Sequence, residues 1–154
     1  MKADERLIEQ SRAFALRTIR MHAYLTKEKR ELCLSKCALR AGTAIGARLS
    51  GTVREMEVSD FKETVKSALK EADETSYWLD LLLESGYLTE KAYDSICEDC
   101  RALAEALQLT LDSVQSEEQD NETDESDTSE EDFPRDPGSS TEPVELPDFT
   151  SLSY

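Results

Sequence analysis

Apolar and small residues recur every three or four positions along the first 115 residues and divide that stretch into four helical segments. In the first segment the inward positions are Leu7, Ser11, Phe14, Thr18, Met21 and Leu25, and the same face is widened by Ile8, Ala15 and Ile19. A second amphipathic helix is predicted over residues 31–54. Its inward positions are Leu34, Ala38, Ala41, Ile45 and Leu49.

The third predicted helix has the most regular spacing, and Ser59 or Asp60 is its expected N-cap. Its inward positions are Phe61, Val65, Ala68, Ala72, Thr75, Leu79 and Leu82. Residues 85–86, Ser-Gly, predict its end, and Thr89 is the expected N-cap of the fourth helix, with a hydrophobic staple between Leu88 and Tyr93. The fourth helix presents Tyr93, Ile96, Cys100, Leu103, Leu107, Thr110 and Val114. Residues 1–115 therefore predict an all-α protein, an antiparallel up-down four-helix bundle.

A stripe of small residues recurs at every fourth position inside the second helix, namely Ala38, Gly42, Gly46 and Ser50. The two glycines cost about 1 kcal/mol each in helix propensity, so another interaction must offset the loss. We expect a close helix crossing, because a stripe without bulk lets a neighbouring backbone approach. The alternative is a flexible hinge.

Charge is distributed unevenly and separates a tail from the bundle. Residues 1–54, 55–115 and 116–154 carry formal charges of +7, −10 and −13. All four prolines also fall in residues 116–154, which hold too few apolar residues to offset the entropy of ordering. We predict that residues 116–154 form a disordered acidic tail.

Location and redox state follow from what the sequence lacks. No segment approaches the roughly 20 apolar residues of a membrane span, and residues 1–6 lack the apolar run of a secretory signal. We therefore expect a cytoplasmic protein without membrane contact, whose cysteines stay reduced.

Candidate chemistry is sparse. Two cysteine pairs on two helices, Cys33 with Cys37 and Cys97 with Cys100, have a spacing that would let four thiolates bind zinc, but buried free thiols are the default interpretation. His22 lacks a partnered nucleophile, so a packed or half-exposed histidine is expected. We predict no enzyme activity, no cofactor and no small-molecule substrate.

Two surfaces are candidates for binding. The first two helices carry basic residues that would form a positive patch for RNA or DNA, unless acids of the later helices neutralise it. These residues are Arg6, Arg12, Arg20, Lys27, Lys29, Lys36, Arg40 and Arg54. On the third helix, Tyr77, Trp78 and Leu81 lie outside the inward seam and predict a protein interface through which the chain self-associates.

The tail adds two expectations. Its charge predicts competition with polyanions for the basic surface. Its more apolar end is a candidate docking segment for a separate partner, through Val144, Leu146, Phe149, Leu152 and Tyr154.

The second and third helices also carry a family resemblance. Residues 34–49 read LSKCALRAGTAIGARL, and residues 60–88 read DFKETVKSALKEADETSYWLDLLLESGYL. They resemble the small bacterial S23, or 23S rRNA intervening-sequence, proteins, which show R-S-G-T-S-I-G-A-N-I followed by D-F and by A-L-K-E-A, E-T and Y-W-L. The sequence departs from that pattern at Arg48, where the family usually has Asn, and at Ser50 and Gly51.

The resemblance implies a four-helix bundle and a homo-oligomer, with ring-like pentamers as the associated form. It implies no specific activity. A structurally similar relative is the accessory protein of diversity-generating retroelements, which partners a reverse transcriptase. The leading interpretation is a non-enzymatic oligomeric binding or accessory protein that acts through protein–protein contacts, and the alternative is a nucleic-acid-binding accessory protein.

Overall fold

Four α-helices and one short 3-10 helix make up the part of the chain that the computed structural model describes, residues 1–122. The α-helices are α1 (Glu5–Glu28), α2 (Leu34–Leu49), α3 (Val58–Glu84) and α4 (Glu90–Glu122), and the 3-10 helix is η1 (Ser50–Val53). Residues 123–154, which include the candidate docking segment of the tail, lie outside the described residues.

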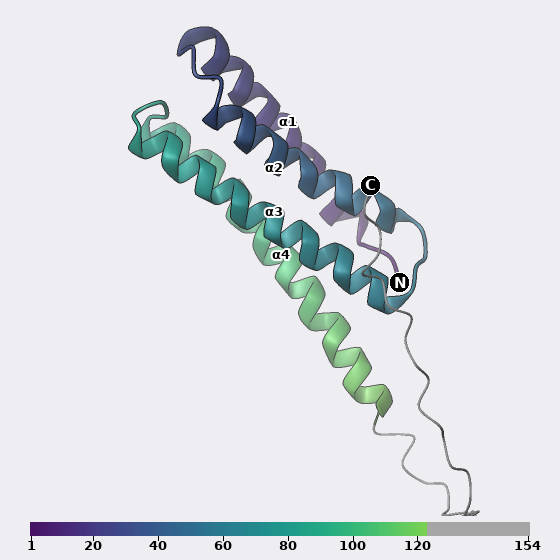
Figure 1. Cartoon of the computed structure of the whole chain (residues 1–154). Helices are drawn as coiled ribbons and strands as arrows, with labels where there is room; N and C mark the ends of the chain where they lie inside the picture. The colour runs from purple at the N-terminus through teal and green to yellow at the C-terminus, as the bar shows by residue number, and fades with distance from the viewer. Residues whose placement is uncertain (123–154) are drawn as a thin grey trace, which may run out of the picture.

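The four helices pack as an up-down bundle, which confirms the predicted fold class (Figure 1). Neighbours in the chain are neighbours in space: α1 packs on α2, α2 on α3 and α3 on α4. The α1–α4 pair is the most sparsely packed of the adjacent pairs. Therefore the bundle is held mainly by three consecutive antiparallel contacts and is open along its fourth side.

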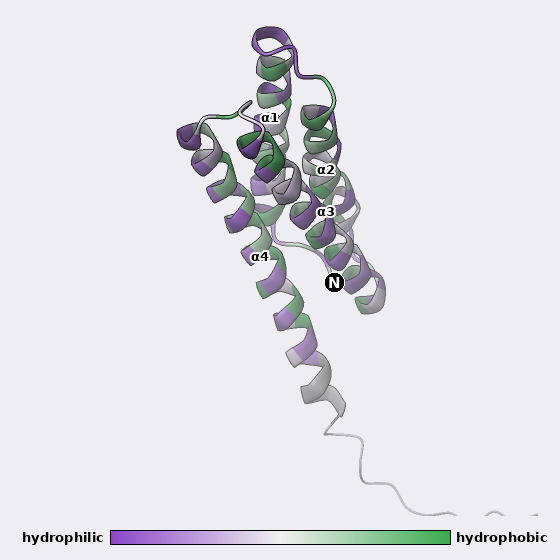
Figure 2. Ribbon diagram, turned by 60° about the vertical axis from the view of Figure 1, so that its left-hand side comes forward, coloured by the Kyte–Doolittle hydropathy of each residue, from purple (hydrophilic) through white to green (hydrophobic). Residues whose placement is uncertain are grey.

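The core follows the predicted seams closely. Every position of the central seam predicted for the first and third helices is buried, because the 3.6-residue period places them on one face, whereas the flanking Ile8, Ala15 and Ile19 are not. Hydrophobic and hydrophilic segments accordingly alternate along each helix in Figure 2. Two buried threonines satisfy their hydroxyls within their own helices, since Thr18 donates to the Ala15 carbonyl at 2.8 Å and Thr75 donates to that of Glu71 at 2.7 Å.

The second helix is shorter than the predicted range of 31–54. It ends at Leu49, and the chain tightens into η1, where the Thr52 hydroxyl donates to the Leu49 carbonyl at 2.6 Å. The Thr52 carbonyl in turn accepts a hydrogen bond from the Ala3 backbone N–H at 3.1 Å. These contacts fasten the end of α2 to the start of the chain and prevent the helix from continuing.

The predicted boundaries of the third and fourth helices also need correction. The third helix begins at Val58, and its N-cap position is Glu57, which makes no side-chain cap, so the prediction of Ser59 or Asp60 is wrong. The fourth helix continues to Glu122, and residues 116–122 are helical although we assigned them to the tail. Thus α4 extends past the start of α3 (Figure 1).

The turn between α3 and α4 matches its sequence signals. Gly86 has φ +80° and its N–H donates to the Leu83 carbonyl at 3.0 Å, which ends α3 in the left-handed conformation that glycine tolerates. The Thr89 hydroxyl accepts a hydrogen bond from the Ala92 N–H at 3.2 Å and caps α4. Leu88 is buried and Tyr93 is half-buried beside the turn, as a hydrophobic staple requires.

The glycines of α2 face α1. A Cβ atom at Gly42 would lie 2.6 Å from Cγ2 of Thr18, whereas one at Gly46 would lie 3.4 Å from Oγ of Ser11. Ala38 is also buried, but Ser50 is exposed in η1 and does not take part. The tighter of the two contacts is therefore at Gly42, and it is with the side chain of Thr18.

The N-terminus of α2 is capped by a glutamate from the preceding loop. The Glu31 carboxylate accepts hydrogen bonds from the backbone N–H groups of Cys33, Leu34 and Ser35 at 2.7–2.8 Å. Burial alone would raise the pKa of Glu31, but these hydrogen bonds outweigh it and hold the pKa below its ordinary value.

A first prediction concerns the glycine stripe. Gly42→Leu should lower the free energy of unfolding by about 1–3 kcal/mol despite the better helix propensity of leucine, because its side chain overlaps Thr18. Gly46→Ala is the matched control and should leave stability unchanged or raise it by up to about 1 kcal/mol. Urea denaturation measures both. A stabilised Gly42→Leu chain would show that the crossing is looser than described.

A second prediction concerns the Glu31 cap. Glu31→Gln should destabilise the chain by about 0.5–2 kcal/mol at neutral pH. Because the folded-state pKa is depressed, the advantage of glutamate is full above its ordinary pKa of 4.5 and declines as the pH falls below that value. Denaturation curves of both chains from pH 7 to pH 3 test this. A difference that does not shrink in acid would contradict the role of the charge.

Candidate functional site

The predicted interface on α3 is partly exposed. Tyr77 has 55% of its surface exposed, whereas Trp78 and Leu81, which we also expect outside the inward seam, are half-buried. Trp78 packs against the core beneath it. Tyr77 is thus the main exposed group among these three residues.

The aromatic pair is held in a fixed arrangement. The rings of Tyr77 and Trp78 meet edge to face, with centroids 5.1 Å apart. The indole N–H of Trp78 donates to Oε1 of Glu74 at 3.3 Å, and the same oxygen forms an ion pair with Arg40 of α2. Because its neighbours are already fixed, Tyr77 offers an apolar contact at a low entropic cost.

A second apolar surface was missed by sequence reasoning. Leu16 and Ile19 on α1 are each 46% exposed, although we assigned Ile19 to the inward face. Ile8 and Ala15, assigned to the same face, are half-buried. The exposure of Leu16 could have been predicted from the sequence, since Leu16 lies on the side of the helix opposite the buried seam.

The predicted basic residues all lie on the surface. Arg40 pairs with Glu74, and the other seven form no ion pair within the part of the chain whose side chains are described, residues 1–117. They do not make one patch. Lys27 and Lys29 lie where α1 passes into α2, whereas Arg6 and Arg54 belong to the opposite end of the α1–α2 pair.

Two arginines outside that set bind across helix boundaries. Arg48, one of the positions that departs from the family pattern, donates from Nε and Nη2 to Oε1 of the buried Glu71 of α3 at 3.1 and 2.6 Å. Arg17 of α1 forms an ion pair with Asp99 of α4 and donates to the Ser95 carbonyl at 2.9 Å. These contacts show why those two charges are not free to bind a partner.

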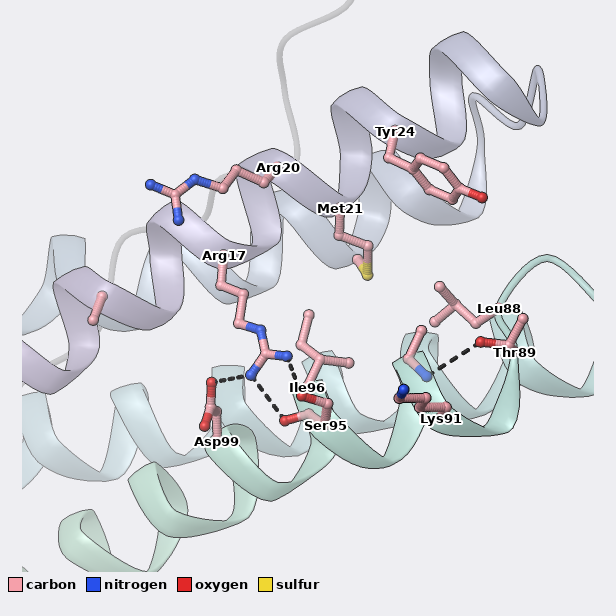
Figure 3. Close-up of a pocket in the computed structure, with 12 residues that line it drawn as sticks. Arg17, Arg20, Met21, Tyr24, Leu88, Thr89, Lys91, Ser95, Ile96 and Asp99 are labelled. Atoms are coloured by element: carbon pink, nitrogen blue, oxygen red, sulfur yellow. Dashed lines mark hydrogen bonds and ion pairs between the residues drawn. The ribbon is translucent and has the colours of Figure 1, made fainter.

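A groove follows the sparsely packed side of the bundle, between α1 and α4 (Figure 3). It has a volume of about 800 Å³. Met21 and Tyr24 of α1 and Leu88 and Ile96 of α4 supply its large apolar side chains, and the Arg17 bridge crosses it. The remaining lining residues are Ala13, Arg20, Thr89, Lys91, Ala92, Ser95 and Asp99.

The cysteines are not gathered into a metal site. Cys33 and Cys37 belong to the N-terminus of α2 and are exposed and half-buried, whereas Cys97 and Cys100 are buried in α4. Among residues 1–117, no group of three or more His, Cys, Asp or Glu side chains is placed to hold a metal ion. Burial raises the pKa of the Cys100 thiol to about 12, so the free thiol is protonated at neutral pH.

The single histidine has a structural contact. Nδ1 of the half-buried His22 lies 2.9 Å from Oγ of Ser35, so the ring joins α1 to the start of α2. This agrees with the expectation of a packed or half-exposed histidine.

No helix within residues 1–122 is long and apolar enough to cross a membrane.

These features define an all-α helical bundle with apolar and charged side chains exposed on its outside. The sequence matches the 23S rRNA-intervening sequence protein family over residues 3–109, and the chain belongs to that family. It is also similar to a crystal structure of a protein of unknown function from the S23 ribosomal protein family of Bacteroides thetaiotaomicron. That likeness has 35% identity and a TM-score of 0.67, and it covers 69% of this chain and 95% of the other. No curated protein matches the sequence.

Proposed function

We propose that this chain is a non-enzymatic, self-associating helical bundle that serves as a binding or accessory module through protein contacts on α3. The observation that carries the proposal is Tyr77, an exposed aromatic side chain held against Trp78 on the outer face of α3. Fixed aromatic groups at the surface are typical of the centres of protein interfaces.

The second apolar surface supports a particular mode of assembly. Helices α1 and α3 lie at diagonal corners of the bundle, each between α2 and α4, so the Leu16–Ile19 surface and the Tyr77 surface belong to different corners. Two unlike surfaces favour a head-to-tail contact between copies of the chain. Such contacts form a closed ring when the rotation from one copy to the next brings the last copy back to the first. A ring-like pentamer is the form that the family resemblance implies.

Self-association gives the third prediction. Light scattering of the full chain at tens of micromolar should give a multiple of the 17.3 kDa chain mass, and Tyr77→Glu should lower it because a charge would be buried in the interface. Leu109→Glu is the matched control, since Leu109 is 67% exposed on α4, outside the proposed interface.

Circular dichroism would verify that each variant is folded. A monomeric mass for the unmodified chain would refute self-association. A mass that Tyr77→Glu leaves unchanged would move the interface to another surface.

We propose nucleic-acid binding as the second candidate function. It is supported by the seven predicted basic residues that remain exposed and without an ion pair in residues 1–117, which weakens the alternative that acids of α3 and α4 neutralise them. Lysine and arginine side chains bind nucleic-acid phosphates favourably because the binding releases counterions from the nucleic acid.

The fourth prediction tests this function by titrating the full chain with a short RNA at low and moderate salt. Affinity should fall with salt, and the double variant Arg12→Glu, Lys36→Glu should weaken it further, whereas Lys66→Glu on α3 should change it less.

A chain ending at Glu122 should bind more tightly, because the acidic residues 123–154 no longer compete. No binding at low salt in either chain would eliminate this candidate.

A further inference from the structure

The groove between α1 and α4 is an apolar surface, and among its lining residues only Arg20 belongs to the set proposed for nucleic-acid binding. Met21, Leu88 and Ile96 form its floor, and Tyr24, half of whose surface is exposed, stands at its edge (Figure 3). The two helices are bridged by Arg17 but do not close over this surface. An apolar groove of about 800 Å³ falls in the range of sites that bury a ligand.

The charged side chains at the rim of the groove indicate which net charge a molecule bound in it should carry. Asp99 is already paired with Arg17, so it does not oppose the remaining charges of the lining. Arg20 and Lys91 line the same groove and form no ion pair within residues 1–117. An occupant with apolar side chains and negative charges would therefore match both the floor and the rim.

We propose that residues 144–154 of the same chain bind in this groove. This segment reads VELPDFTSLSY and alternates apolar groups with the acids Glu145 and Asp148. Its apolar residues match the floor and its two carboxylates match Arg20 and Lys91. The two prolines at positions 143 and 147 favour an extended backbone, which suits a narrow groove between two helices.

The length of chain between the groove and this segment permits the contact. From Ile96 to Glu122 the α4 axis runs roughly 39 Å, at about 1.5 Å per residue, so the connecting chain must return over that distance. Residues 123–143 make the connection, and a chain of that length spans at most about 70 Å when fully extended. Eight acidic residues in this stretch repel one another and favour extension over compaction.

Covalent attachment favours this occupant over a separate molecule. A tethered segment is present at an effective concentration in the millimolar range, so even a weak intrinsic affinity fills the site. RNA would match the basic rim but not the apolar floor. The proposal does not depend on self-association or on RNA binding, because one chain contains both the groove and the segment.

The experiment is photo-crosslinking of the full chain with benzoylphenylalanine in place of Phe149, followed by mass spectrometry of the digested protein. We expect crosslinks within one chain to the groove residues Met21, Tyr24 or Ile96. Mixing 15N-labelled and unlabelled chains separates this result from a crosslink between copies, which would carry both isotope patterns.

Two variants with matched controls give the test its specificity. Ala92→Trp fills the groove, and Lys91→Glu reverses a rim charge, so each should lower the crosslink yield by about fivefold or more. Ala102→Trp and Lys66→Glu place the same changes at exposed positions outside the groove and should leave the yield unchanged.

Three results would overturn the proposal: crosslinks that fall mainly outside the groove, crosslinks that join different chains, and equal yields in Ala92→Trp and Ala102→Trp. A chain that remains monomeric in light scattering would refute the proposed interface on α3 and would leave this result unaffected. The two proposals can therefore fail separately.

Discussion

The close contact between Gly42 of α2 and Thr18 of α1 is the constraint on which the arrangement of the bundle depends. A Cβ atom at position 42 would lie 2.6 Å from the Thr18 methyl group, so glycine at this position avoids a clash with the Thr18 side chain. Because α2 also packs extensively on α3, and α3 on α4, each helix is positioned by its neighbour in the chain. The fourth side receives no comparable contact, and the Arg17 bridge spans it. Tight packing at one edge and an open groove at the other are thus two results of the same arrangement.

Helical periodicity predicted the core because it depends on local geometry. Apolar residues at this spacing, such as Phe61 and Leu79, lie on the same side of any α-helix. That side is the one that the bundle buries. The ends of the helices were predicted less well. The α2 cap comes from Glu31, a residue type that is uncommon as a cap and that acts here from outside the helix. Likewise, η1 is fixed by a contact between Thr52 and Ala3, which are distant in sequence.

The surfaces were predictable only where one helix defines them. Tyr77 lies opposite the buried seam of α3, and its position on that helix was sufficient to predict that its side chain is exposed. The groove is formed by residues about 75 positions apart, such as Met21 and Ile96, and its existence depends on how closely two non-consecutive helices approach. Similarly, no local pattern distinguishes Arg17, which binds α4, from Arg20, which lines the groove without an ion pair in residues 1–117.

The distribution of charge explains how one small bundle can offer several separate surfaces. Arginines that face a neighbouring helix, such as Arg17, Arg40 and Arg48, are paired with acids and contribute to the packing of the bundle. Basic residues on the outer faces of α1 and α2, such as Arg12 and Lys36, are exposed and form no ion pair within residues 1–117. The exposed aromatic group lies on α3, and the apolar groove lies between α1 and α4. These features therefore lie on different parts of the bundle, and Arg20 is the residue that the basic set and the groove share.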